Sequence, residues 1–493
     1  MVQFDKINLS YFIGFFILLY LTIRIFTVPI SDDEYMTIEM HASQNILDIL
    51  ITGQQNLDWA ANNHVLNTLF IKLELFVFGW QDWAIRLHIL MSFVVGYFFC
   101  YKLLKIFITS EFRILLYMLL VFLNPYLLDF YGIARGYALS ISAFIAALFY
   151  LFKYLETKSL KDFNALYFCM FISIWSNFSA LYLLLILNLI IAYENRNFIK
   201  NLEQKKALLL GLVFSSLIVV IITFPLIKTL SSPIVYGGNS GIFNDMIVNY
   251  ISQFIHHNPK IDRHLIFTKD WKLVEILGII LFLLWIALTL FSYTFKPMHK
   301  IKQSQNIFLF FLIAIATLSK ILFFVNQTPF PTGRTQLLFS MAFYLGICVA
   351  FERIINTKPK FVSVLIFVVS LLITHFFYSL TFVNTIDWWQ NGDAKDITQY
   401  LKMEIKRSNS NEIKTIGAEN WQYHSLAFYV KGQLRNSLDI VWTDLSGDII
   451  FDYLLAPKHR KSEVSDNYVS IHEFNKTILY KIKTKSSNHE SMR

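Results

Sequence analysis

The sequence carries little charge and few of the patterns that mark soluble enzymes. Only 16% of its 493 residues are charged, and 55% are hydrophobic, whereas soluble domains carry about 25% charged residues. Its three cysteines all fall in apolar runs, so we expect free thiols rather than a disulfide framework. It has no zinc-finger spacing, P-loop or Rossmann glycine pattern. These absences exclude a soluble globular class, a disulfide scaffold and the common nucleotide-binding folds.

Long apolar runs make up most of the chain, and 48 of its residues are Phe. A helix needs about 20 apolar residues to cross a bilayer, and the runs predict about eleven transmembrane helices. The sequence therefore predicts an α-helical polytopic membrane protein. The predicted spans are 9–30, 86–108, 112–131, 133–152, two short helices within 163–193 that meet near Asn177, 207–228, 273–295, 306–325, 335–352 and 361–384.

Lys and Arg gather in alternate loops between these runs, and the positive-inside rule places such loops in the cytoplasm. The net charge of +9 thus has a topological origin and implies no nucleic acid partner. We expect a multi-pass protein of the inner (cytoplasmic) membrane with its N-terminus in the cytoplasm. The expected outer regions are the loops 31–85 and 229–272 and the tail 385–493.

Residues 65–79 are apolar but too short to span, and they include Lys72 and Glu74. Their apolar side chains follow helical spacing, which predicts an amphipathic helix on the membrane surface. If this segment were a span, every later basic loop would face outward, which the positive-inside rule rejects. The apolar positions are Leu66, Leu69, Phe70, Leu73, Phe76 and Val77.

The tail differs from the rest of the chain because it is polar and holds short β-like runs. We expect residues 1–384 to form the membrane domain and residues 385–493 a small extracytoplasmic α/β domain. The expected strands are Lys414–Ala418, Leu438–Trp442, Phe451–Leu455 and Ile478–Ile482, with a helix near His424–Val430.

Three acidic residues follow the first span directly, in the stretch Ser31-Asp32-Asp33-Glu34. The spacing S-x-x-E is that of a capping box, which would give these residues a purely structural role at a helix start. Asp33, Thr37 and His41 would then share one helical face. A carboxylate on that face at the membrane boundary could also serve a site, so both interpretations stand.

Several motifs occur in an order that resembles the GT-C superfamily of integral-membrane glycosyltransferases. "DDEY" follows the first span, "DWAANNHVLNTLF" lies in the outer loop, and "FGWQDWAIRLHIL" leads into the next span. Asp33-Glu34 match the family's acidic pair, and Arg86 matches its R-L step, while Asn63-His64 stand where His-Pro is common. "IARGYALSISAF" and "PTGRTQLLFSMAFYLG" are similar to later span entries. The likeness covers most of residues 9–380.

The resemblance implies an inverting enzyme that moves a sugar from a polyprenyl-phosphate donor to a lipid, glycan or protein acceptor outside the membrane. Such a reaction needs a general base, which implies Asp33 or Glu34 as the catalytic carboxylate. Asp33 is preferred because Glu34 has a competing role in the capping box. The phosphate leaving group needs cations, for which Arg135 and Arg334 are candidates. Their alternative role is to extend from span ends to the interface.

Four further residues are candidates for substrate binding, each with a structural alternative. His64 and Asn63 could contact substrate or phosphate, or simply cap the surface helix. Asp129 could face the same cavity, and Tyr137 could be an interfacial aromatic. Arg86 is expected to pair with an acid such as Asp82 or to anchor the outer loop.

No metal site is predicted, although a divalent cation is possible because some GT-C enzymes use one. His256, His257 and His264 fit no standard ligand spacing and predict an exposed loop.

Two other functions fit a multi-span chain with basic outer residues. A transporter or flippase for lipid-linked glycans would more often show internal repeats and charges in mid-span, and we find neither. An O-antigen-type ligase or polymerase would place its site in the late outer loop 229–272 rather than in 31–85.

Overall fold

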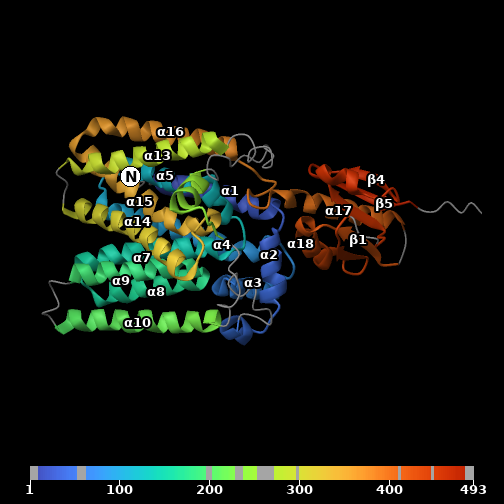
Figure 1. Ribbon diagram of the computed structural model, residues 1–493, viewed down its shortest axis with the longest axis horizontal. Coiled ribbons are helices and arrows are strands. Elements are labelled where there is room, and N and C mark those ends of the chain that lie inside the picture. The colour runs from blue at the N-terminus through green and yellow to red at the C-terminus, as the bar shows by residue number, and fades with distance from the viewer. Residues whose placement is uncertain are drawn as a thin grey trace, which may run out of the picture.

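The computed structural model describes residues 9–52, 63–195, 202–227, 237–251, 271–295, 299–408, 412–445 and 449–483. A bundle of long helices forms one part of the molecule, and a smaller domain built on a β-sheet lies beyond one end of it (Figure 1). The acidic stretch and helix α3 (Val65–Phe78) lie between these two parts.

Eight helices in the described ranges are long and apolar enough to cross a membrane, and the chain is a multi-pass membrane protein. Helix α1 exposes Phe12, Phe15 and Phe16, as expected of a face that contacts lipid rather than water. The spans are α1 (Leu9–Thr27), α4 (Leu87–Phe107) with its preceding 3-10 turn, α7 (Gly136–Thr157), α9 (Leu181–Asn195) with its own turn, α10 (Leu202–Ile227), α14 (His299–Asn326), α15 (Leu337–Thr357) and α16 (Val362–Ser379). Helix α13 (Trp271–Tyr293) covers the run expected at 273–295.

One expected span is interrupted. The run 112–131 forms α5 (Glu111–Phe122) and the short α6 (Pro125–Phe130) rather than one continuous helix. Asn124 causes the break because its side chain accepts hydrogen bonds from the amides of Tyr126 and Leu127 and so caps a new helix. Pro125 suits the first position of that helix because it has no amide hydrogen to satisfy.

The long run 163–193 is divided as its sequence predicts. Helix α8 (Leu160–Ser176) ends at Asn177, whose extended backbone and side-chain cap start a short 3-10 turn before α9. The joint at Asn177 brings the end of α8 beside the start of α7, which is where the candidate site lies.

The segment 65–79 forms helix α3, as expected. Its polar residues Asn67, Thr68 and Glu74 are buried against the protein, whereas Phe76 is 88% exposed. This inside-out arrangement suits a helix whose apolar side contacts lipid at the membrane surface.

The C-terminal domain contains a five-stranded sheet in the order β2-β1-β3-β5-β4. Strands β2, β1 and β3 are parallel, and β5 pairs antiparallel with both β3 and β4. The strands are β1 (Lys414–Ala418), β2 (Leu438–Trp442), β3 (Tyr453–Pro457), β4 (Tyr468–Glu473) and β5 (Thr477–Ile482), with helices α17 (Ala394–Ser408) and α18 (Asn420–Tyr429). The sequence predicts four of these strands and α18, and it misses β4 and α17.

The core of this domain continues into the outer segment after α1. Ile30, Tyr35 and Ile38 belong to the same buried cluster as Leu426 of α18 and Leu455 of β3. The proposed division at residue 384 stays a prediction, but the two parts share buried apolar contacts across it. The tail is therefore positioned firmly over the acidic stretch.

The orientation of the helices in the membrane can be tested with fusions. A reporter that is active only outside the cytoplasm should be active when fused after Gly238 or Pro331. A reporter that is active only inside should be active after Lys158 or Lys302, because basic loops stay in the cytoplasm. A cytoplasmic signal after Gly238 or Pro331 would contradict the orientation and move the acidic stretch to the other side.

Candidate active site

The acidic stretch begins a short helix with a complete capping box. Helix α2 (Asp32–Met36) starts at Ser31, whose side chain accepts from the Glu34 amide at 3.3 Å, while Glu34 Oε2 accepts from the Ser31 amide at 2.8 Å. This confirms the predicted capping role of Ser31 and Glu34. The chain continues directly as a π-helix over Thr37–Ala42.

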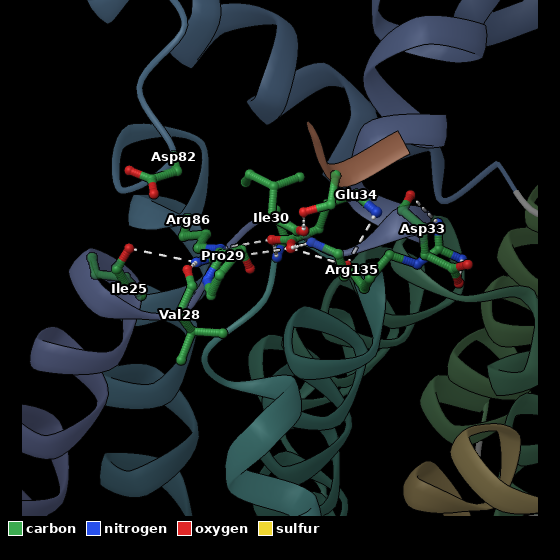
Figure 2. Close-up of polar contacts among 12 residues, drawn as sticks. Ile25, Val28, Pro29, Ile30, Asp33, Glu34, Asp82, Arg86 and Arg135 are labelled. Carbon is green, nitrogen blue, oxygen red and sulfur yellow. Dashed lines mark hydrogen bonds and ion pairs between the residues drawn. The ribbon is translucent and has the colours of Figure 1, made fainter. Parts of the chain in front are cut away.

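Glu34 also forms a fully buried ion pair with Arg86 (Figure 2). Arg86 Nε and Nη2 lie 2.7 and 2.6 Å from the two carboxylate oxygens, and the Ala134 amide donates to Oε1 at 2.6 Å. Both side chains are 0% exposed. Burial alone would raise the pKa of Glu34, but Arg86 outweighs it and holds the pKa below its ordinary value. Both oxygens of Glu34 are therefore occupied by the fold.

Arg86 ties the end of α1 to the start of α4. Its Nη1 and Nη2 donate to the carbonyls of Val28 and Pro29 at 2.8 and 2.9 Å (Figure 2). The acid that pairs with Arg86 is Glu34 rather than the expected Asp82, which instead contacts Lys395 at 2.5 Å. The anchoring role expected of Arg86 is what its carbonyl contacts provide.

Asp33 points to a different set of partners and meets both candidate arginines. Its Oδ2 lies 2.7 Å from Nη1 of Arg334 and 3.3 Å from Nη2 of Arg135. Asp33 keeps 20% of its side chain exposed, against 12% for Arg334 and 2% for Arg135. The structure thus brings together three predicted site residues that are far apart in the chain.

The electrostatic balance around Asp33 favours its ionised form. Burial alone would raise its pKa, but Arg334, Arg135 and a hydrogen bond from Trp388 outweigh burial and hold the pKa below its ordinary value. One carboxylate and two guanidinium groups leave an excess of one positive charge at this point. An excess of positive charge is suited to a phosphate group.

Arg135 is further oriented by the helix that carries Asp33. Its Nη1 donates to Thr37 Oγ1 at 2.7 Å and to the Asp33 carbonyl at 3.3 Å. Thr37 Oγ1 in turn donates to the Asp33 carbonyl at 2.7 Å. Asp33 and Thr37 therefore both contact Arg135, as expected of side chains on one helical face.

Residues of the tail also lie beside this cluster, and we predicted a site role for none of them. The Arg334 guanidinium lies over the Trp388 ring, with its Cζ atom 5.3 Å from the ring centre. Asn391 Nδ2 donates to Asp32 Oδ1 at 3.1 Å, and His424 Nδ1 lies 4.0 Å from the same oxygen. Burial raises the pKa of Asp32 well above its ordinary value, despite the opposing bond from Asn391.

The residues around His64 lie next to Arg135. His64 Nδ1 lies 2.8 Å from the Ser176 carbonyl, and its ring contacts the Tyr137 ring edge-on at 5.0 Å. His64 occupies the N-cap of α3 without a side-chain cap bond. Asn63 Oδ1 instead accepts from Thr68 Oγ1 at 2.8 Å, so Asn63 braces the first turn.

Asp129 is engaged by a cation that we did not predict. Arg24 Nη2 lies 2.5 Å from Asp129 Oδ1, and the Ile386 amide donates to Oδ2 at 2.8 Å. Arg24 also donates to the Thr381 carbonyl at 3.1 Å, so this buried pair fixes the segment that leads into the tail. The sequence did contain a sign of this pair, because an arginine inside an apolar run requires an acidic or carbonyl partner.

Within the ranges that the structure describes, no three His, Cys, Asp or Glu side chains come together as a metal site. The divalent cation therefore stays a prediction without assigned ligands. His256, His257 and His264 lie outside the described residues, as does most of the loop 229–272.

Two solved structures are similar to this chain. One is ArnT from Cupriavidus metallidurans in the apo state, with 10% sequence identity and a TM-score of 0.43. The other is ArnT from the same organism bound to undecaprenyl phosphate, with 12% identity and a TM-score of 0.45. Each alignment covers 96% of this chain and 97% of ArnT. No protein-family model matches the chain, and no curated protein matches its sequence.

Proposed function

We propose that the chain is a glycosyltransferase that takes a sugar from a polyprenyl-phosphate donor and passes it to a lipid, glycan or protein acceptor outside the membrane. The proposal rests on one observation: Asp33 forms ion pairs with both Arg135 and Arg334 at the end of the bundle next to the tail. A carboxylate beside two cations provides a base for the acceptor and a binding site for the phosphate.

The proposed reaction is a single displacement. The acceptor oxygen or nitrogen attacks the anomeric carbon while the bond from that carbon to the phosphate oxygen breaks. Asp33 receives the acceptor proton, and the lipid phosphate leaves as an anion held by the arginines. Attack from the face opposite the leaving group inverts the configuration at the anomeric carbon.

Donor binding would also prepare the base. Arg334 and Arg135 hold the Asp33 pKa low, which makes its carboxylate a weak base. A phosphate group would compete with Asp33 for the same guanidinium groups. The Asp33 pKa would then rise toward its ordinary value, so that the carboxylate becomes a stronger base only when the donor is present.

This assignment leaves Glu34 with a structural role. The carboxylate that receives a proton must reach the acceptor, and both oxygens of Glu34 already accept hydrogen bonds inside the protein. Asp33 keeps an exposed fraction that Glu34 lacks. We therefore assign the base role to Asp33 alone.

The arginine assignment predicts a specific loss of lipid-phosphate binding. Undecaprenyl phosphate, the lipid in one of the ArnT structures, is a suitable probe. Arg334→Met should weaken its binding by roughly tenfold to a hundredfold, since a hydrogen bond to a charged group contributes about 1.5–3 kcal/mol. Arg135→Met should act in the same direction. Binding would be measured in lipid nanodiscs.

Arg334→Lys is the matched control, because it keeps the charge and loses the bidentate geometry. We expect it to retain part of the affinity that Arg334→Met loses. Wild-type affinity in both methionine variants would place the phosphate site elsewhere, with Arg263 and Lys269 of the late outer loop as the next candidates.

The competing flippase function can be told apart by the product. A flippase would bind the lipid but would never release free undecaprenyl phosphate from a glycosylated donor.

A further inference from the structure

His64 presents one ring nitrogen whose hydrogen-bonding state is determined by its neighbour. Its Nδ1 lies 2.8 Å from the Ser176 carbonyl oxygen. A carbonyl oxygen only accepts, so Nδ1 must carry the hydrogen. In a neutral imidazole, Nε2 then holds a lone pair and can only accept a hydrogen bond.

The surroundings keep the ring neutral. Burial, and then the positive charge of Arg135, hold the pKa of His64 well below its ordinary value, and Arg334 adds to this effect. A second proton on Nε2 would create a third cation beside two arginines. Nε2 is therefore a lone-pair acceptor at neutral pH.

This acceptor has no partner among the described residues. His64 is 7% exposed, and its Nε2 is a buried atom without a hydrogen-bond donor. Asn177, next to the carbonyl that anchors His64, also has a buried Nδ2 without an acceptor within those ranges. Leaving a buried polar group unpaired costs about 1–3 kcal/mol, so two such atoms at one joint indicate a ligand.

The position of His64 is built into the fold. A Cβ atom on Gly136 would lie 1.8 Å from the Ser176 oxygen and 2.8 Å from the His64 Cβ. Only glycine therefore allows α7 to start so close to the ends of α3 and α8. Because Arg135 immediately precedes Gly136, the histidine and the phosphate-binding arginine are held by the same backbone segment.

A neutral ring whose Nε2 holds a lone pair is poorly matched to the phosphate itself. Ionised phosphate oxygens accept hydrogen bonds and would be repelled by a lone pair. The partner must bring an O–H or N–H group to a point beside the phosphate, and the sugar joined to that phosphate does so. We propose that His64 Nε2 accepts a hydrogen bond from a hydroxyl or amino group of the transferred sugar, which makes His64 a specificity-determining residue. This inference rests on the proposed glycosyltransferase function.

Two substitutions separate this role from a structural one. His64→Asn keeps a donor for the Ser176 carbonyl at the δ position and removes the ε acceptor. His64→Gln keeps an acceptor at the ε position and removes the δ donor. The donors are undecaprenyl phosphates carrying a hexose, a pentose or an aminopentose, and the one that wild-type protein turns over is used for both variants.

We expect His64→Asn to bind undecaprenyl phosphate as tightly as the wild type but to lose roughly tenfold or more in kcat/KM with the glycosylated donor. His64→Gln should retain more of this kcat/KM. A donor that lacks the recognised hydroxyl or amine should show the same loss with wild-type protein and no further loss with His64→Asn, because the same bond is removed twice.

Three results would overturn the inference. Weakened undecaprenyl phosphate binding by His64→Asn, comparable to that of Arg334→Met, would make His64 a phosphate ligand. Wild-type kcat/KM in His64→Asn, with a loss only in His64→Gln, would show that His64 has only a structural role, through its hydrogen bond to the Ser176 carbonyl. If wild-type protein neither bound undecaprenyl phosphate nor turned over any donor, the glycosyltransferase proposal would fail, and this inference with it.

Discussion

Asp33→Asn is expected to slow sugar transfer by roughly 10²–10⁴-fold, the usual cost of losing a general base. Asparagine keeps the size of the side chain and removes the proton acceptor. It also removes the carboxylate that, in the proposed site, would compete with phosphate for Arg334 and Arg135. The variant should therefore bind undecaprenyl phosphate at least as tightly as the wild type while failing to transfer the sugar. Single-turnover transfer and equilibrium lipid binding measure the two effects separately.

The neighbouring Asp32→Asn is the matched control, since it makes the same chemical change one residue away. Asp32 Oδ1 accepts from Asn391, and an asparagine oxygen can do the same. We expect Asp32→Asn to retain most of the transfer rate. Equal losses in both variants, or weaker lipid binding by Asp33→Asn, would indicate that the stretch only supports the local fold.

Asp32→Asn also has a pH-dependent effect on stability whose sign follows from its environment. The pKa of Asp32 is raised in the folded protein, so the wild type loses stability as the pH rises through that value. The variant has no charge to bury and avoids this loss. Its thermal unfolding temperature should exceed that of the wild type at neutral pH, and the difference should shrink as the solution is acidified.

Glu34→Gln should damage the fold far more than its conservative chemistry suggests. The change leaves Arg86 as a buried charge without its partner, for which the expected cost is about 3–5 kcal/mol of unfolding free energy. The pKa of Glu34 is lowered in the folded protein, so its contribution is present above its unfolded pKa and is lost as the pH falls through the folded value. Thermal unfolding in detergent at neutral pH would measure the loss.

The double variant Glu34→Gln/Arg86→Met tests whether the ion pair is the cause. Removing both charges should recover part of the stability that either single change loses, because no buried charge is left unpaired. A stable but inactive Glu34→Gln protein would contradict this account. It would return Glu34 to the list of candidate bases beside Asp33.

Local features of the site could be predicted because they depend on residues close in sequence. The capping box at Ser31 and Glu34, the surface helix after His64 and the break at Asn177 all follow from spacing within one or two turns. The break at Asn124 was equally readable, since an Asn-Pro pair is a typical helix start, but the continuous hydrophobicity of 112–131 concealed it.

The contacts that close the site could not be predicted, because they join segments that lie far apart in the chain. Asn391 and His424 reach Asp32 from the tail, and the position of Trp388 beside Arg334 depends on how that tail docks. The pairing of Arg24 with Asp129 depends in the same way on how α1 and α6 pack. No periodicity or motif in the sequence encodes these distances.

The tail consequently has a role beyond that of an attached domain. Its linker residue Asn391 and its helix α18 contact Asp32, and Tyr429 of that helix donates to Asp82 at 3.1 Å. The Arg24–Asp129 pair holds the start of the linker. We infer that the tail helps to hold the acidic stretch in the geometry that lets Asp33 face both arginines.

The proposed role of Asp33 as the base in sugar transfer onto cell-surface molecules is tested most directly by mass spectrometry of cell-surface glycolipids and glycoproteins. Three strains would be compared: one without the gene, one restored with the wild-type gene, and one restored with Asp33→Asn at a matched amount of membrane-inserted protein. The account predicts that one glycan mass is present in the wild-type strain and absent from the other two. A surface glycan profile that Asp33→Asn restores as fully as the wild type does would contradict it.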